Sequence, residues 1–292
     1  MRKQAMQAGC YALLSITFWG ISFVSTKAVL QEVGAFTLLS TRFGIGAFFL
    51  FMIIMGTRVR WAFSLRTIPN LLVLAVLGVF VHQMLQAFSL LTIQASEAGW
   101  LISLSPIFTA LLSVLFLHER FKGWYVIGMT IAAFGIVVLT TNGDVSAVVG
   151  HWQWGYVFMI ASTLNWAVYT LLLRGLSLPY PPLLTTFYIS LFGFFMTLPL
   201  FVKFKGWTQL VQLSGSGWSH LLFLGVFVSA LAYWYWGKAL TLLRASKVST
   251  FLYLEPLATL IGAVLILHER IVLTTILGGM LILVGVILVQ RQ

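Results

Sequence analysis

Residues 104–120 read LSPIFTALLSVLFLHER, and residues 254–270 read LEPLATLIGAVLILHER. The two stretches align without a gap at an offset of 150 residues, so that Pro106 matches Pro256 and both stretches end in His-Glu-Arg. Leucine-rich segments resemble one another by chance, but a charged triplet at a fixed distance from a proline does not. The pair therefore indicates that the chain contains an internal repeat.

The similarity extends outward from these two stretches. Ala95-Ser96 matches Ala245-Ser246 at the same offset of 150 residues. Further upstream, Trp19 corresponds to Trp166 at an offset of 147 residues. The repeat thus covers most of the chain rather than one pair of helices.

The composition indicates that lipid surrounds the chain. Hydrophobic residues make up 60% of the 292 residues and charged residues only 8%, whereas a soluble domain carries about 25% charged residues. A membrane-spanning helix needs roughly 20 apolar residues. We expect such spans at residues 9–30, 36–55, 68–90, 97–117, 123–141, 154–174, 182–202, 218–240, 247–267 and 272–289.

Each repeat, residues 9–140 and residues 154–289, is expected to hold five of these spans. Because five is an odd number, the second repeat must lie upside down in the membrane relative to the first. Inverted repeats are typical of secondary transporters, which hold their substrate near the midplane where the repeats meet. The predicted fold class is an all-α integral membrane protein with ten transmembrane helices in two inverted five-helix repeats.

The distribution of Lys and Arg predicts the orientation of the chain. With a cytoplasmic N-terminus, eleven basic residues fall inside and three outside. The inside set is Arg2, Lys3, Arg58, Arg60, Arg66, Arg120, Lys122, Arg174, Arg244, Lys247 and Arg291, and the outside set is Lys203, Lys205 and Arg270. Because basic residues concentrate in cytoplasmic loops, we expect a multi-pass protein of the cell membrane with both termini in the cytoplasm.

Other classes of protein are disfavoured. The net charge of +11 resides largely in short loops between apolar runs, so we interpret it as an orientation signal and not as a nucleic-acid surface. Cys10 is the only cysteine; it can form neither a disulfide within the chain nor a thiolate cluster, and we expect no metal and no cofactor. The sequence lacks a Gly-x-x-x-x-Gly-Lys nucleotide loop, and residues 118–122 (HERFK) lack the last histidine of a zinc-protease motif.

These motifs resemble those of the EamA family of the drug/metabolite transporter superfamily. The resemblance rests on Trp19-Gly20, an Ala-Ser pair followed ten residues later by Pro, the two Leu-His-Glu-Arg endings, and Glu255-Pro256. It covers nearly the whole chain and implies a carrier that exports or imports amino acids, metabolites or drugs. Ser105 stands where the second copy has Glu255, so the two halves are not chemically equivalent.

Polar and aromatic residues recur at helical spacing on the first, third, fourth, sixth, eighth and ninth expected spans. We expect these faces, with Arg42 of the second span, to line a substrate cavity. The candidates are Trp19, Ser22, Arg42, His82, Gln83, Gln86, Trp100, Ser103, Asn165, Trp166, Tyr169, Tyr233, Tyr253 and Glu255. The simpler alternatives are serines bonded to their own backbone and an interfacial belt of Trp and Tyr. The glycine-rich fifth and tenth spans are expected to serve in packing or in a homodimer.

His82 and Glu255 are the candidates for proton coupling, because both are expected well inside a span. An ionised carboxylate there costs about 3 kcal/mol or more unless it is paired or hydrated. The structural alternative for Glu255 is pairing with Arg42 or Lys27. Arg42 itself either stays inside or reaches the interface, whereas Lys27 and Lys238 are expected to snorkel.

Pro106 and Pro256 each remove a backbone hydrogen bond and are candidate hinges. Together these features predict a secondary transporter that moves a small organic solute, such as an amino acid, a metabolite or a drug-like compound, across the cell membrane by alternating access. The aromatic residues favour an amphiphilic or aromatic solute. The expected partners are this solute and the lipid bilayer, with no nucleic acid. A channel-like or lipid-translocating protein is the alternative, and a membrane-embedded enzyme is a distant third.

Overall fold

The computed structural model describes residues 2–57, 59, 61, 63–117, 123–141, 153–176, 178–243, 248 and 250–290. Over these ranges the chain is built from helices and connecting segments, and none of the described residues is in a strand. Residues 118–122 and 244–247, which hold His118-Glu119-Arg120 and Ala245-Ser246, lie outside the described residues. The expectations for those residues therefore stay predictions.

The first half of the described chain contains the long N-terminal helices and two interrupted spans. Its elements are α1 (Arg2–Leu30), α2 (Ala35–Gly56), η1 (Leu65–Thr67), α3 (Ile68–Ala75), η2 (Val76–Val81), α4 (His82–Leu90), α5 (Ala95–Ile102), α6 (Ser105–Leu117) and α7 (Gly123–Thr140). The second half follows the same order. Its elements are α8 (Trp154–Gly175), α9 (Pro182–Lys203), α10 (Gly206–Gln212), α11 (Gly215–Phe223), η4 (Leu224–Ala232), α12 (Tyr233–Leu242), η5 (Thr250–Leu254), α14 (Glu255–Ile266) and α15 (Leu273–Gln290).

Among the described residues, seven helical stretches are long and apolar enough to cross a membrane. They are Met6–Leu30, Ala35–Gly56, Leu65–Leu90, Ala95–Leu112, Trp154–Leu173, Pro182–Lys203 and Gly215–Leu242. Three shorter apolar helices, Val126–Thr140, Phe251–Ile266 and Leu273–Val289, occur where the fifth, ninth and tenth spans are expected. The all-helical, multi-pass character of the chain is thus confirmed, whereas the arrangement of ten spans in inverted repeats stays a prediction.

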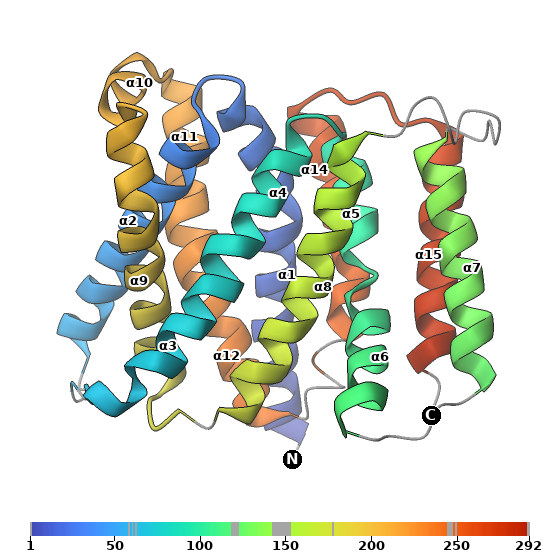
Figure 1. Cartoon of the computed structure of the whole chain (residues 1–292), viewed down its shortest axis with the longest axis horizontal. Helices are drawn as coiled ribbons and strands as arrows, with labels where there is room; N and C mark the ends of the chain where they lie inside the picture. The colour runs from blue at the N-terminus through green and yellow to red at the C-terminus, as the bar shows by residue number, and fades with distance from the viewer. Residues whose placement is uncertain are drawn as a thin grey trace.

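The helices stand roughly side by side, and both ends of the chain lie at the lower face in the view of Figure 1. The pair α7–α15 stands at one side of this bundle. It is held together by glycines, because a Cβ on Gly128 or Gly135 would collide with the backbone of α15 at Gly285 or Gly278. The glycine-rich spans therefore pack against each other within the chain; a homodimer stays a prediction.

Each half contains a π-helical segment at an equivalent position, which the sequence did not predict. The π-helical segment η2 occupies residues 76–81, and the π-helical segment η4 covers residues 226–231, which lie 150 positions further on. Such wide turns are rare and often lie at functional sites. In this fold both segments face the same cavity, as described below.

The two candidate hinge prolines each lie in the first turn of a helix. Pro106 follows a break in which α5 ends at Ile102 and α6 begins at Ser105. Pro256 is the second residue of α14 and follows the short 3₁₀ segment η5. Proline is well tolerated in a first turn, because the amide groups there have no partner within the helix. The expected interruption of both spans is therefore present, and a hinge motion stays a prediction.

Candidate functional site

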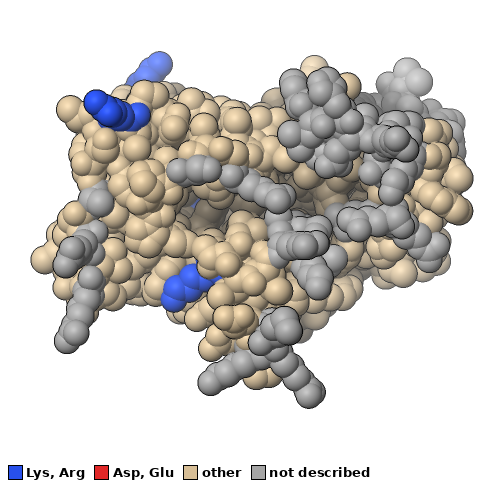
Figure 2. All heavy atoms as spheres, turned by 90° about the horizontal axis from the view of Figure 1, so that it is seen from below, with Lys and Arg blue, Asp and Glu red and all other residues tan. Residues whose placement is uncertain are grey.

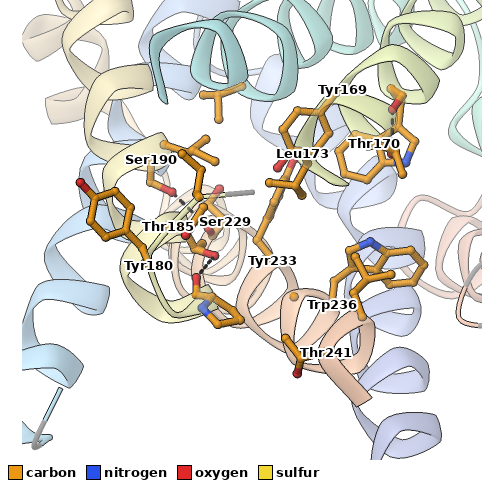
Figure 3. Close-up of a pocket in the computed structure, with 18 of the residues that line it drawn as sticks. Tyr169, Thr170, Leu173, Tyr180, Thr185, Ser190, Ser229, Tyr233, Trp236 and Thr241 are labelled. Atoms are coloured by element: carbon orange, nitrogen blue, oxygen red, sulfur yellow. Dashed lines mark hydrogen bonds between the residues drawn. The ribbon is translucent and has the colours of Figure 1, made fainter. Parts of the chain in front are cut away.

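A cavity of about 400 Å³ lies between α8, α9 and α12, and α2, η2 and η4 contribute one residue each. Its lining contains no Lys, Arg, Asp, Glu or His. The wall combines aliphatic and aromatic side chains with hydroxyl groups, several of which point into the space in Figure 3. The polar and aromatic members are Phe43, Trp166, Tyr169, Thr170, Tyr180, Thr185, Thr186, Ser190, Ser229, Tyr233, Trp236 and Thr241.

This large cavity extends toward the lower face of the molecule. Its lining includes Leu178 and Tyr180 in the connection from α8 to α9, Pro182 at the start of α9, and Leu243 directly after α12. That connection and the end of α12 lie at the same end of the bundle as the chain termini (Figure 1). Seen from below, the surface is hollowed near its middle (Figure 2). A solute could therefore enter from this face.

The residues 150 positions apart in the two π segments meet here. Val79 of η2 and Ser229 of η4 both line the large cavity. Helix α9 contributes Thr185, Ile189 and Ser190 to the same cavity, and Ser190 Oγ donates to the carbonyl of Ser229 at 3.5 Å. Helix α9 was not among the spans expected to line the cavity, although Thr186 and Ser190 lie four residues apart on one helical face.

A second, much smaller cavity of about 30 Å³ lies beyond Trp166 and Tyr233. This volume is on the scale of a single water molecule. It is lined by Trp19, Ser22, Phe23, His82, Gln83, Gln86, Ile102, Ser105, Trp166, Val228, Tyr233, Leu252 and Glu255. Most of the predicted site residues thus converge, but on this small cavity and not on the larger one.

Trp166 and Tyr233 line both cavities and form the wall between them. Their ring centroids are 6.0 Å apart, and both pack edge-on against Trp19, at 5.4 Å and 5.5 Å. Trp236 lies 5.2 Å from Trp19 and completes the cluster. Edge-to-face pairs of this kind are attractive beyond their buried area, so the wall is a packed aromatic plug.

Arg42 lies inside the bundle between the two cavities and is only 1% exposed. Its Nε donates to Ser229 Oγ at 3.0 Å, and its Nη1 donates to Gln83 Oε1 at 2.9 Å. Its Nη2 has no hydrogen-bond partner among the described residues. The alternative that Arg42 snorkels to the interface is therefore wrong, and its two partners connect it to one cavity each.

Glu255 is 4% exposed and faces the small cavity. Within the described part of the chain, no ion pair joins it to Arg42 or Lys27. The ammonium of Lys27 instead donates to the carbonyl of Ile93 and lies 4.0 Å from Glu269. Pairing of Glu255 with a buried cation, the structural alternative, is thus not found in this conformation.

His82 is held by hydrogen bonds on both ring nitrogens. Its Nδ1 lies 2.8 Å from Ser162 Oγ and 3.1 Å from the Ser162 carbonyl, and its Nε2 lies 3.3 Å from Gln86 Nε2. These partners fit a neutral imidazole that donates from Nδ1 and accepts the Gln86 amide at Nε2. The ring also stacks on Trp166 at 4.9 Å, so His82 connects the small cavity to the aromatic plug.

The remaining predicted site residues take other positions. Tyr169 lines the large cavity, whereas Asn165 donates to the carbonyl of Leu77 in η2 at 2.7 Å. Trp100 is 1% exposed, and its indole packs against Gly279 of α15. The Ser103 hydroxyl donates to the backbone carbonyl of Trp100. Tyr253 is partly buried beside the cluster that includes Trp100. Asn165, Trp100, Ser103 and Tyr253 line neither cavity, and Ser103 bonds its own backbone, as the simpler alternative expected.

Lys27 and Lys238, the two lysines expected to snorkel, make polar and aromatic contacts, respectively. Lys238 lies 4.1 Å from the ring centroid of Trp234 and 5.3 Å from that of Tyr11. Such contacts between a cation and a ring stabilise an ammonium near the edge of an apolar region. Lys27 contacts the carbonyl of Ile93 and Glu269, and its snorkelling stays a prediction.

The chain is similar to known proteins of one family. Residues 6–141 and 153–291 each match the EamA-like transporter family. An uncharacterized transporter of Archaeoglobus fulgidus is 30% identical over 283 residues, covering 96% of this chain and 97% of that protein. The uncharacterized transporter YetK of Bacillus subtilis is 26% identical, covering 90% of this chain and 81% of its own length.

Two further comparisons concern an export function and the fold. A probable terminal-alkyne amino-acid exporter of Streptantibioticus cattleyicolor is 24% identical, covering 96% of this chain and 92% of that protein. A protein of known crystal structure superimposes with a TM-score of 0.67 at 19% identity, covering 96% of this chain and 97% of the other; at this identity the likeness concerns the fold alone. Because both halves match the family and the helices are apolar and long enough to span a bilayer, the chain is a membrane protein that belongs to the EamA-like transporter family.

Proposed function

We propose that the chain is a secondary transporter that carries a small organic solute across the cell membrane by alternating access, and that the large cavity is its solute site. The observation that carries this proposal is a 400 Å³ cavity that extends to one face and ends at an aromatic plug. A channel would need a continuous path through that plug. The closed plug is instead consistent with a carrier in a conformation that is open to one side of the membrane.

Ten spans in two inverted repeats provide the geometry for this mechanism. The sequence offset of 150 residues, the π segments at equivalent positions and the three shorter apolar helices support the arrangement. Cysteine replacements at Arg120 and Arg270, labelled with a membrane-impermeant maleimide, should react from opposite sides of the membrane. Reaction of both from one side would contradict the inverted repeat.

The excess of basic residues assigns the lower face, where the termini lie, to the cytoplasm. Under this assignment the conformation described here is open to the cytoplasm. Cleavage of a terminal tag by a protease in inside-out vesicles, and not in intact cells, would test the orientation.

The solute is a small amphiphilic compound with an apolar or aromatic part. Trp166, Tyr169 and Trp236 offer flat apolar contacts, and the hydroxyl groups of Ser190, Ser229 and Thr185 offer hydrogen bonds. Sites of this composition, mostly apolar with a few polar groups, are typical of small-molecule pockets. An amino acid is one such solute, and the similarity to a probable terminal-alkyne amino-acid exporter supports including amino acids among the first candidates.

Proton coupling is assigned to the small cavity. Glu255 and His82 both border it, and Trp166 and Tyr233 separate it from the solute site by one layer of side chains. A proton bound at Glu255 would neutralise a charge next to Trp166 and Tyr233. A resulting shift of these two side chains would change the shape of the solute site, because they line both cavities.

The decisive experiment has two steps. A thermal-shift screen of the purified protein against amino acids, other metabolites and drug-like compounds should give a hit that Trp236→Ala removes and Trp207→Ala retains, because Trp207 is a half-exposed residue of α10 outside both cavities. Uptake of that compound into proteoliposomes should saturate and respond to a pH gradient. Glu255→Gln should abolish the response to the gradient while binding persists. Flux that rises linearly with concentration would favour a channel.

A further inference from the structure

The carboxylate of Glu269 ties together three parts of the chain at the upper end of the bundle. It lies in residues 267–272, the segment that crosses the top of the molecule from α14 to α15 in Figure 1. Its Oε1 accepts the backbone N–H of Ala95 at 2.9 Å. Its Oε2 accepts the backbone N–H of Ser96 at 3.2 Å and the Ser96 hydroxyl at 2.8 Å. Lys27 of α1 lies 4.0 Å away.

These bonds complete the start of α5. The first four N–H groups of a helix have no partner within it. Here Gln94 N–H donates to Glu97, and Glu97 N–H donates to the side chain of Gln94. The two N–H groups between them, of Ala95 and Ser96, are satisfied by Glu269 alone among the described hydrogen bonds. A helix of the first repeat thus depends on a carboxylate of the second repeat.

Both helices that meet at Glu269 also reach the small cavity. α5 runs from Ala95 to Ile102, which lines that cavity, over about 12 Å. α14 begins at Glu255 in the same cavity and ends just before Glu269. Gly99 packs so closely on Thr259 that a Cβ there would come within 2.7 Å. The upper end and the small cavity are therefore joined by two closely packed helices.

We infer that Glu269, with Ser96 and Lys27, forms a latch that keeps the small cavity closed to the upper side, and that this latch must release for the cavity to open there. The inference rests on the proposed alternating access. Separation of α5 from the α14–α15 connection exposes the two N–H groups and the Ser96 hydroxyl to water and removes Glu269 from Lys27. The strength of these bonds therefore sets how often the upper side opens.

The test uses the full-length protein in proteoliposomes of determined orientation. Cys10, the only cysteine, is replaced by Ser, and Ser105→Cys places a nearly isosteric thiol in the wall of the small cavity. A membrane-impermeant maleimide is added to the upper side, and the labelling rate is measured. We expect Glu269→Gln to raise this rate about tenfold, because it weakens all three charge-assisted hydrogen bonds and removes the charge near Lys27. We expect Ser96→Ala to raise it about threefold, because it removes the hydroxyl bond alone.

Glu32→Gln is the matched control. Glu32 also accepts a backbone N–H and a hydroxyl, both from Ser214, at the same end of the molecule, but it is exposed and joins α1 to α11 without contacting α5. Its labelling rate should equal that of the parent protein. An unchanged rate in Glu269→Gln, or an equal rise in Glu32→Gln, would overturn the latch.

Two further measurements separate the possible failures. If Glu269→Gln does not fold, Ser96→Ala and Lys27→Gln carry the test, with monodispersity and thermal melting as checks on folding. Solute uptake by the parent protein is recorded in the same vesicles. Uptake in the parent with unchanged labelling in the variants refutes the latch alone, whereas altered labelling without any uptake refutes the transporter and leaves the latch standing.

Discussion

Glu269 and Ser96 lie 173 positions apart in the chain, yet the Glu269 carboxylate accepts both the backbone N–H and the hydroxyl of Ser96. The contact joins the two repeats at the end of the bundle opposite the chain termini. At the other end, the large cavity extends toward the surface. The molecule therefore has a specific polar contact between its halves at one end and an accessible cavity at the other, which is the asymmetry that the proposed carrier mechanism needs in each of its states.

Arg42→Met should separate function from stability. The guanidinium is buried without an acidic partner in the described residues, so no ion pair offsets its desolvation, and an apolar side chain of similar size removes that cost. We expect the free energy of unfolding to change by less than about 1 kcal/mol, while uptake falls at least about tenfold because Gln83 and Ser229 lose their common partner. Thermal melting and uptake on one preparation measure both; a large loss of stability would assign Arg42 a structural role.

Gly279→Ala should destabilise the attachment of α15. A Cβ at this position collides with the indole of Trp100, which is itself fully buried. We expect a loss of about 1–3 kcal/mol, as for other overpacked interiors. Gly123→Ala is the control, because a Cβ at Gly123 meets nothing within 4 Å. Equal melting temperatures for the two variants would contradict the packing of Trp100 on α15.

Glu32 should make a small contribution to stability that depends on pH. Its backbone and hydroxyl hydrogen bonds from Ser214 lower the pKa of the carboxyl group below its ordinary value of 4.5. Above pH 4.5 the carboxylate is ionised in both the folded and the unfolded chain, so the contribution is complete there. As the pH falls through the folded-state pKa, the contribution is lost. The melting temperatures of the parent and of Glu32→Gln should therefore converge on acidification, and a gap that persists in acid would contradict this assignment.

Ile189→Trp should block the large cavity. Ile189 is 3% exposed and lines the cavity on the α9 side, so a larger ring must occupy space that the solute needs. We expect uptake and ligand-induced thermal stabilisation to disappear. Phe195→Trp, on the exposed face of the same helix, should leave both unchanged. Retained uptake in Ile189→Trp would place the solute site elsewhere.

Much of the fold follows from local sequence. Apolar runs set the helices, and the glycines of the fifth and tenth spans predict a close helix pair, found as Gly128 on Gly285. Helical spacing also indicated His82 and Gln86, which line one cavity. These features depend on periodicity along one helix, which a sequence displays directly.

Contacts between residues of different helices could not be predicted, because they depend on how the helices pack against each other. No spacing rule connects Lys27 to Glu269 or Glu97 to Tyr156, whose hydroxyl donates to that carboxylate at 2.8 Å. Trp100 has the same helical spacing as cavity residues, but Gly279 of a distant helix offers it a flat surface. The hydroxyl groups of α9 were not assigned to the cavity, because Thr and Ser are common in membrane helices where they bond their own backbone, as Thr186 does to Pro182.

The division of the interior into two compartments has a consequence for how such proteins diversify. Among the described residues, Trp166 and Tyr233 alone belong to both cavities. Substitutions along α9, at Thr185 or Ser190 for instance, can reshape the recognition of cargo without touching Glu255 or His82. Under the proposed roles of the two cavities, cargo preference and energy supply can thus evolve separately on one scaffold, and a designer could alter either one alone.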